Sequence, residues 1–231
     1  MPVTAAAPGT PHADECIRMP KILLVRHGHV EGIEPKRFRG RADLSLTGRG
    51  KGEARAVARR IASAWSPAAI YTSPLLRCRA TAAAIGEACR LETHVLDDLT
   101  DIDYGAWTSR SYDEIEALEP QRFAAWLVTP HLIRFPDGES LQDLIARAAD
   151  ALRFVLAHHA DETIVLVSHD SLNRALLLQL LDQPLSAYWR LDQSPCCINE
   201  IDIAGGSIRI LRLNDTAHLT PQPQGSSLWR N

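Results

Sequence analysis

The sequence KILLVRHGH, residues 21–29, places an apolar run directly before an arginine and two histidines. An apolar run of this length is typical of a strand that is buried on both faces, as in a parallel sheet. A second stretch, TIVLVSHD at residues 163–170, repeats the arrangement. Ligands of open α/β sheets bind beyond the carboxyl ends of the strands. We therefore expect His27 and His169 to lie where such a pocket forms.

Helix and strand signals alternate along the chain between these two runs. Short apolar segments at 68–71 and 93–96 are expected strands. Thr47 is a suitable N-cap for a helix whose apolar side chains recur on one face. Ser73-Pro74 predicts a second helix, with the serine as N-cap and the proline at the first position, that runs to about Cys89.

The same alternation continues in the second half of the chain. Ser140 and Asp143 resemble a capping box at the start of a long amphipathic helix. A leucine-rich helix follows the strand at 163–168, and segments 197–203 and 207–213 are expected to form a hairpin. Together these signals predict an α/β fold, a three-layer α/β/α sandwich around a central, mostly parallel sheet.

The expected domain spans residues 20–213. Residues 1–19 and 214–231 lack apolar periodicity and are predicted to be flexible tails. Met19 stands directly before the first strand, and translation from Met19 is a hypothesis that mass spectrometry of the native protein would test. Residues 100–138 interrupt the alternation, and we expect them to form a small, mainly helical cap made of loops and short helices.

Composition argues against several classes of partner. The net charge of −3 provides no field that would gather nucleic acid. No apolar run is long enough to cross a bilayer, and the N-terminus lacks the features of a secretory signal. The five cysteines include no CxxC pair and are expected to be reduced thiols. We therefore expect a cytoplasmic protein without a nucleic-acid or membrane partner, and a homodimer is left open.

Arg26 and Arg77 are suited to hold a phosphate group. A guanidinium matches phosphate oxygens and stays charged, and the charge of Arg26 lowers the pKa of a neighbouring histidine. A neutral His27 can then attack phosphorus. Gly28 would let the backbone approach the ligand closely. Arg77 falls in the first turn of the helix expected after Ser73-Pro74, where the helix N-terminus already favours an anion.

Five segments of the chain match the motifs of one known family. They are LVRHG at 24–28, RFRGRADLSLTGRG at 37–50, SPLLRCRATA at 73–82, DIDYGAW at 101–107 and VSHD at 167–170. In this order and spacing they resemble the histidine phosphatase, or phosphoglycerate-mutase-like, superfamily. The resemblance implies that His27 is a nucleophile that forms a phosphohistidine. It also implies that Arg26, Arg77 and His169 hold the phosphoryl oxygens, and that neither a metal nor an organic cofactor is needed.

The loop after His27 departs from the family pattern. Ile33 stands where the family commonly has asparagine, and Arg39 stands where it usually has glutamine. Three arginines make this loop more basic, which would suit a substrate with extra negative charge. We expect Arg37 to bind the phosphate, and Arg39 and Arg41 to be solvated surface side chains.

Two carboxyl groups are candidates to protonate the leaving group. In the mutase-like branch the matching residue is Asp101, one methylene shorter than the usual glutamate. In the acid-phosphatase branch the donor directly follows the second histidine, which Asp170 matches. We favour Asp101, with Asp170 sharing or replacing its role.

The predicted function is hydrolysis of a small-molecule phosphomonoester through a phosphohistidine on His27. The alternative is a cofactor-dependent phosphoglycerate mutase, and a non-catalytic phosphate-binding regulator ranks last because both histidines and both arginines are present. The remaining histidines are expected to be structural, except His29, for which pocket and solvent positions are both open. Tyr104 and Trp107 are expected to pack rather than to stack on substrate.

Overall fold

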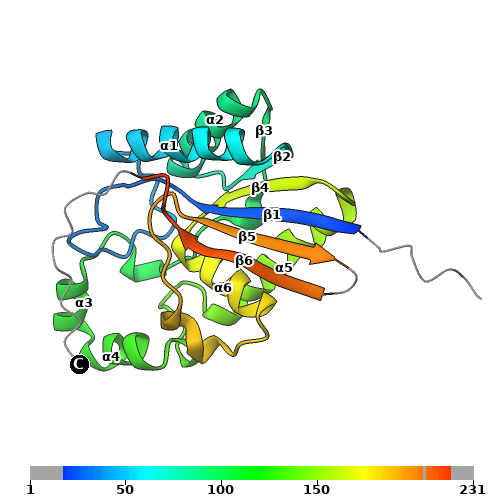
Figure 1. Ribbon diagram of the computed structural model, residues 1–231. Helices are drawn as coiled ribbons and strands as arrows, with labels where there is room; N and C mark the ends of the chain where they lie inside the picture. The colour runs from blue at the N-terminus through cyan, green and yellow to red at the C-terminus, as the bar shows by residue number, and fades with distance from the viewer. Residues whose placement is uncertain (1–17, 205–206, 220–231) are drawn as a thin grey trace, which may run out of the picture.

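A six-stranded sheet forms the centre of the computed structural model, which describes residues 18–204 and 207–219 (Figure 1). The strand order is β3-β2-β4-β1-β5-β6. Four strands are parallel: β1 (Arg18–Arg26), β2 (Pro67–Thr72), β3 (Thr93–Val95) and β4 (Thr163–Ser168). The last two, β5 (Ile198–Ala204) and β6 (Ser207–Asp215), pair antiparallel as the predicted hairpin. Residues 205–206, between the two strands, lie outside the described residues.

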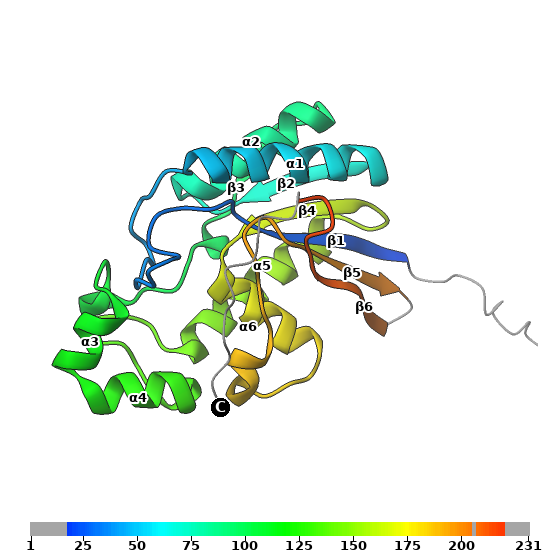
Figure 2. The ribbon, with the colours of Figure 1, turned by 60° about the vertical axis from the view of Figure 1, so that its left-hand side comes forward.

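Helices cover both faces of the sheet (Figures 1 and 2). Helices α1 (Gly48–Ala64) and α2 (Leu76–Cys89) lie on one face, and α5 (Leu141–His158) and α6 (Asp170–Leu180) lie on the other. Alternate side chains of β1 enter the two cores. Leu23 packs in the core with α1 and α2, and Leu24 packs in the core with α5 and α6. The predicted three-layer sandwich is confirmed.

The segment between β3 and α5 is mainly helical, as predicted. It contains α3 (Tyr112–Leu118), α4 (Pro120–Val128) and the short 3₁₀ helices η1 (Asp97–Leu99), η2 (Gly105–Trp107) and η3 (Pro130–Leu132). A cluster of aromatic rings joins this segment to the main domain: Phe38, Tyr104, Trp107, Trp126 and Phe135. Trp107 is buried in it, which confirms its predicted packing role, whereas Tyr104 packs in the cluster and also lines the candidate site.

Strands β1 and β6 extend beyond the two predicted ends of the domain, residues 20 and 213. Strand β1 begins at Arg18, which pairs with Ala204. At the other end β6 continues to Asp215, and the backbone N–H of Asn214 donates to the side chain of Asn199. Backbone pairing therefore orders residues that composition assigned to tails. The rest of the predicted tails, residues 1–17 and 220–231, lies outside the described residues.

The start of α2 also differs from the prediction. The helix begins at Leu76 rather than at Pro74, and its N-cap, Leu75, makes no side-chain capping bond. Asp43 supplies the missing acceptor, because its Oδ1 accepts the N–H of Leu76 at 2.8 Å. The Ser73 hydroxyl instead lies 2.7 Å from Nε2 of His169, in the candidate site.

Two capping predictions are confirmed. The Thr47 side chain accepts the N–H of Gly50 at the start of α1, and Ser140 and Asp143 form the capping box of α5. Every helix within residues 18–204 and 207–219 is too short or too polar to span a bilayer.

Candidate active site

His27 and His169 meet at the carboxyl ends of two neighbouring parallel strands. Arg26 at the end of β1 pairs in register with Ser168 at the end of β4, and the next residue on each strand is a histidine. The backbone N–H of His27 donates to the carbonyl of Ser168 at 2.9 Å. The two imidazole rings are buried, with centroids 5.2 Å apart.

Arg77 lies between the two rings. Its Nε is 3.2 Å from Nε2 of His27 and 3.2 Å from Nδ1 of His169. Its terminal nitrogens donate to the carbonyls of Ala42 and Gly40 at 2.7 and 2.6 Å. The side chain is fully buried in the first turn of α2. A guanidinium fixed in this position can hold an anion against both histidines.

The hydrogen bonds of His27 leave one ring nitrogen available for chemistry. Nδ1 lies 2.7 Å from the carbonyl oxygen of Gly28, so Nδ1 carries the proton and donates it there. The lone pair is then on Nε2, which faces Arg77. Burial lowers the pKa of His27 well below its usual value, and the charges of Arg77 and Arg26 lower it further. The neutral ring is the nucleophilic form.

His169 is fixed in a similar way. Its Nε2 lies 2.7 Å from the Ser73 hydroxyl, so Nδ1 is directed toward Arg77. Burial lowers the pKa of His169 well below its usual value, and the charges of Arg77 and then His27 act in the same direction.

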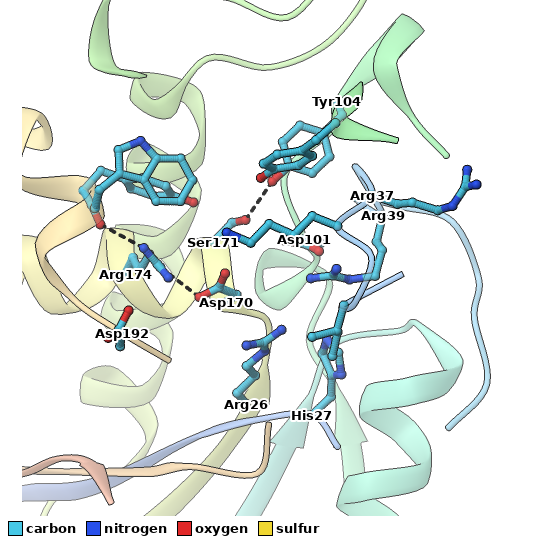
Figure 3. Close-up of a pocket in the computed structure, with 16 residues that line it drawn as sticks. Arg26, His27, Arg37, Arg39, Asp101, Tyr104, Asp170, Ser171, Arg174 and Asp192 are labelled. Atoms are coloured by element: carbon cyan, nitrogen blue, oxygen red, sulfur yellow. Dashed lines mark hydrogen bonds and ion pairs between the residues drawn. The ribbon is translucent and has the colours of Figure 1, made fainter. Parts of the chain in front are cut away.

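The two candidate acids have different surroundings. Asp101 is buried, with Oδ2 3.1 Å from Nη2 of Arg77 and 3.6 Å from Nδ1 of His169. Burial raises the pKa of Asp101 above its usual value, although the charge of Arg77 opposes the change. Asp170 accepts a hydrogen bond from Nε of Arg174 at 2.8 Å, as Figure 3 shows. Burial acts to raise the pKa of Asp170, but the charges of Arg26 and Arg174 outweigh it and hold the pKa below its usual value.

A cavity of about 240 Å³ opens beside His27, Asp101 and Asp170, which line it, whereas Arg77 and His169 are buried behind its lining. Its lining is rich in charge and comes from several elements: Arg26, His27, Ile33, Lys36, Arg37, Arg39, Gly40, Asp101, Tyr104, Tyr112, Asp170, Ser171, Arg174, Tyr188, Trp189 and Asp192. Arg26 is buried and donates from Nη1 to the carbonyl of Gln193. In Figure 3 the guanidinium groups of Arg26 and Arg39 are directed toward the space beside His27.

A model of the histidine phosphatase superfamily (branch 1) matches residues 22–216. The chain belongs to this superfamily. The predicted family, the α/β fold and the class of phosphoric monoester hydrolase are confirmed.

Two relatives and one solved structure illustrate the range of this family. The chain is 34% identical over 201 residues to Phosphoserine phosphatase 1 of Hydrogenobacter thermophilus, covering 87% of this chain and 95% of the relative. It is 35% identical over 213 residues to a Proteus mirabilis protein named "Probable phosphoglycerate mutase GpmB", covering 87% and 96%. A mycobacterial glucosyl-3-phosphoglycerate phosphatase, Rv2419c with VO3, superposes with a TM-score of 0.77 at 25% identity, covering 85% and 100%.

Gly28 has a packing role in this histidine phosphatase. Its N–H donates to the Thr81 hydroxyl at 3.1 Å, so it is not available to a ligand. A Cβ at this position would lie 2.6 Å from the carbonyl oxygen of Gly50 on α1. Gly28 is therefore needed for close packing against α1, and its close approach to the phosphate stays a prediction.

Arg37 is a predicted phosphate ligand whose guanidinium the structure does not bring to the histidines. It lies on the cavity wall, but its guanidinium donates to the carbonyl of Ser109 and pairs with Glu114 at 3.8 Å. Figure 3 shows this guanidinium directed away from His27. His29 does not line the cavity. Its ring is instead directed to the start of α1, where Nδ1 lies 3.0 Å from the Thr47 hydroxyl.

The prediction that Arg39 is a surface residue is also wrong. Arg39 lines the cavity, and burial lowers its pKa, with a further contribution from the charge of Arg26. Arg41, two residues on, is exposed as predicted and pairs with Asp103 and Glu139 at 3.5 and 2.7 Å. Both residues lie on one irregular loop, where the sequence has no period that would indicate which side chain turns inward.

Sequence reasoning missed Lys36, Arg174 and Asp192, which also line the cavity. Arg174 had a detectable signal, because it lies four residues after Asp170 on one helix and therefore on the same face. Among residues 18–204 and 207–219, no three His, Cys, Asp or Glu side chains lie together as metal ligands would. The expectation that no cofactor is needed stays a prediction.

Proposed function

We propose that this histidine phosphatase hydrolyses a small phosphomonoester in two steps, through a phosphohistidine on His27. One observation carries the proposal. Nε of Arg77 lies 3.2 Å from a ring nitrogen of each histidine, so an anion held by Arg77 would touch both rings. The lone pair of His27 faces that position, and its pKa is lowered.

In the first step, Nε2 of His27 attacks phosphorus and the ester P–O bond breaks. Arg26, Arg77 and His169 stabilise the charge on the phosphoryl oxygens. The departing oxygen takes a proton from Asp101 and leaves as the alcohol. Phosphate also competes with Asp101 for Arg77, so substrate binding weakens the cationic contact of Asp101 and favours its protonated form.

We assign the proton donor to Asp101 rather than Asp170. Asp101 lies nearer to the reacting groups, with Oδ2 3.6 Å from His169, and burial raises its pKa. Asp170 is paired with Arg174, and its lowered pKa keeps it ionised. Asp170 is then a structural partner that holds Arg174 and offsets the charge of Arg26.

In the second step, water attacks the phosphohistidine. The carboxylate of Asp101 accepts a proton from the water, the N–P bond breaks, and inorganic phosphate leaves. Asp101 is thereby returned to its protonated form, and His27 to its neutral form. The cycle therefore restores every group that it used.

The relatives suggest acidic phosphate esters as substrates, because their names specify phosphoserine, phosphoglycerate and glucosyl-3-phosphoglycerate. The partner expected from the sequence, a small phosphate ester, fits a cavity of about 240 Å³. The cytoplasmic location, the absence of a nucleic-acid partner and a homodimer stay predictions.

Three substrates and one variant test the proposed function. Wild type and His27→Ala are incubated without added metal with p-nitrophenyl phosphate, O-phosphoserine and 3-phosphoglycerate. We expect wild type to release phosphate and His27→Ala to lose at least about a thousandfold in kcat, since removal of a nucleophile leaves only binding effects. Exchange between 2- and 3-phosphoglycerate without phosphate release would identify a mutase instead. Full activity of His27→Ala would overturn the proposal.

A further inference from the structure

Three cations that line the cavity have no acidic partner within residues 18–204 and 207–219. They are Arg26, Lys36 and Arg39. The other guanidinium groups of the site each face a carboxylate at 2.8 to 3.8 Å: Arg37 with Glu114, Arg77 with Asp101, and Arg174 with Asp170. The unpaired cations therefore mark where the cavity would accept negative charge from a ligand.

Hydrogen bonding points to the same groups. Arg26 is 5% exposed, and the buried Nε atoms of Arg26 and Arg39 have no hydrogen-bond partner in the part of the chain that the structure describes. A buried N–H donor without an acceptor is costly, so an anionic ligand that supplied acceptors to these donors would relieve that cost. Figure 3 shows both guanidinium groups directed toward the space beside His27.

The three cations lie at different depths. His27 and Arg26 are at the buried floor of the cavity. Lys36 is exposed and lies at the mouth, with Nζ 5.9 Å from the centre of the Tyr112 ring. Arg39 is half-buried. Both Arg39 and Lys36 belong to the loop that joins β1 to α1. A substrate whose phosphate lies against His27 extends its leaving group past Arg39, whose guanidinium faces the space beside His27, toward Lys36 at the mouth.

The charge balance of the loaded site leaves room for one more negative group. With Asp101 protonated and Arg37 balanced by Glu114, five cations and two carboxylates remain: Arg26, Lys36, Arg39 and Arg174 of the lining and the buried Arg77, against Asp170 and Asp192. Three positive charges are thus uncompensated, and a phosphate dianion neutralises two of them. The remaining one matches a single carboxylate.

We propose that Arg39 and Lys36 form a second anion-binding subsite that selects phosphomonoesters with a carboxylate a few bonds from the phosphate. Arg39 supplies buried donors with a fixed direction, and Lys36 supplies a flexible charge at the mouth. This inference rests on the proposed phosphatase reaction, but it assigns the two residues to specificity rather than to the chemical step.

The test uses two pairs of substrates that differ in the carboxylate. One pair is 3-phosphoglycerate and glycerol 3-phosphate, and the other is O-phosphoserine and phosphoethanolamine. Phosphate release is measured over a range of concentrations for each compound. We expect wild type to favour the acid of each pair by at least about tenfold in kcat/KM, as a charged hydrogen bond would provide.

Two variants assign this preference to the subsite. Arg39→Gln is expected to raise KM for the carboxylate substrates about tenfold or more, with little change for the partners that lack the carboxylate. Arg39→Lys is expected to retain part of the preference. Lys36→Gln should raise KM for the acids by less than about fivefold, because its ammonium is exposed. Lys51→Gln, which removes an exposed charge on α1, is the matched control.

The outcomes separate this inference from the proposed function. Equal kcat/KM in wild type for the two members of a pair, with and without the carboxylate, would overturn the proposed subsite while leaving the phosphatase reaction intact. An equal loss of kcat/KM in Arg39→Gln for substrates with and without the carboxylate, at an unchanged melting temperature, would also overturn the proposed subsite. Absence of p-nitrophenyl phosphate hydrolysis by wild type would overturn the proposed function itself.

Discussion

Asp101 and Asp170 show how two carboxyl groups in one cavity acquire different properties. Both are close to arginines, but Asp101 is buried with a raised pKa, whereas Asp170 is held ionised by Arg26 and Arg174. Separation of pKa values within a pair of this kind is typical of acid–base catalysis. The sequence left both acids open, because it specifies neither burial nor the partners of each carboxylate.

Asp101→Asn tests the assignment of the proton donor. We expect this variant to slow hydrolysis of alkyl esters by about a hundredfold or more, since their alcohol leaves only with a proton. Hydrolysis of p-nitrophenyl phosphate should change far less, because nitrophenolate is a good leaving group. The measurement is kcat for both types of ester in Asp101→Asn and in Asp170→Asn. If only Asp170→Asn shows the asymmetry, the assignment is wrong.

Three loop residues explain why the sequence predicted the phosphate ligands only in part. Arg26, His27, Arg77 and His169 follow from strand ends and a helix start, and the structure brings them together. The positions of the other three residues, Arg37, Arg39 and Gly28, depend on how the loop after β1 folds. Gly28 packs against α1, Arg37 contacts the helical segment after β3, and Arg39 bonds within the loop. None of these contacts has a local sequence signal.

At the scale of elements, β1 and β4 were predictable because they are short apolar runs buried on both faces. The start of α2 was not, because its cap comes from Asp43, which lies 33 residues away in sequence. This distant cap leaves Ser73 to hold His169. A local capping rule therefore failed at the point where tertiary contacts build the site.

The space around two glycines predicts opposite effects when each is replaced by alanine. Gly28→Ala places a Cβ 2.6 Å from a backbone oxygen and should lower the free energy of unfolding by about 1–3 kcal/mol. It should also lower kcat by about a hundredfold, because His27 is the adjacent residue. Gly52→Ala lies within α1, where the new Cβ would meet no described atom within 4 Å outside its own stretch of helix, and it should stabilise by about 0.4–1 kcal/mol.

Urea unfolding of both glycine variants, with kcat measured alongside, provides the check. Gly28→Ala with wild-type stability and wild-type kcat would contradict the account of how α1 positions the nucleophile.

At the scale of the whole molecule, the site makes stability depend on pH. His27 and His169 are buried with lowered pKa values, whereas in the unfolded chain each titrates near pH 6.5. Below pH 6.5 the unfolded chain therefore binds more protons than the folded one, so stability is present above this pH and is lost as the pH falls. For each histidine the expected loss is about half of 1.4 kcal/mol per pH unit at pH 6.5 and approaches about 1.4 kcal/mol per unit at lower pH.

Unfolding free energies of wild type, His27→Gln and His169→Gln between pH 7 and 5.5 measure this dependence. Each variant should lose about half of the slope that the two histidines contribute, and wild type should show the steepest slope. If both variants keep the wild-type slope, the histidines are not held neutral by the fold.

The overall architecture was largely predictable, whereas the segment after β3 was predictable only in kind. Alternating strand and helix signals define the layers, and the connection rules of parallel sheets restrict their arrangement. The position of α3 and α4 depends on aromatic contacts from distant segments, such as Phe38 with Tyr112 and Trp126 with Trp189. Such contacts have no period in the sequence.

Direct detection of the phosphoenzyme tests the central claim. Wild type is mixed with O-phosphoserine, quenched in alkali within milliseconds, and digested for tandem mass spectrometry under conditions that preserve phosphohistidine. We predict phosphate on Nε2 of His27, with the amount of phosphoenzyme rising before free phosphate accumulates. Phosphate on a different residue, or steady phosphate release by an enzyme that is never phosphorylated, would contradict the account.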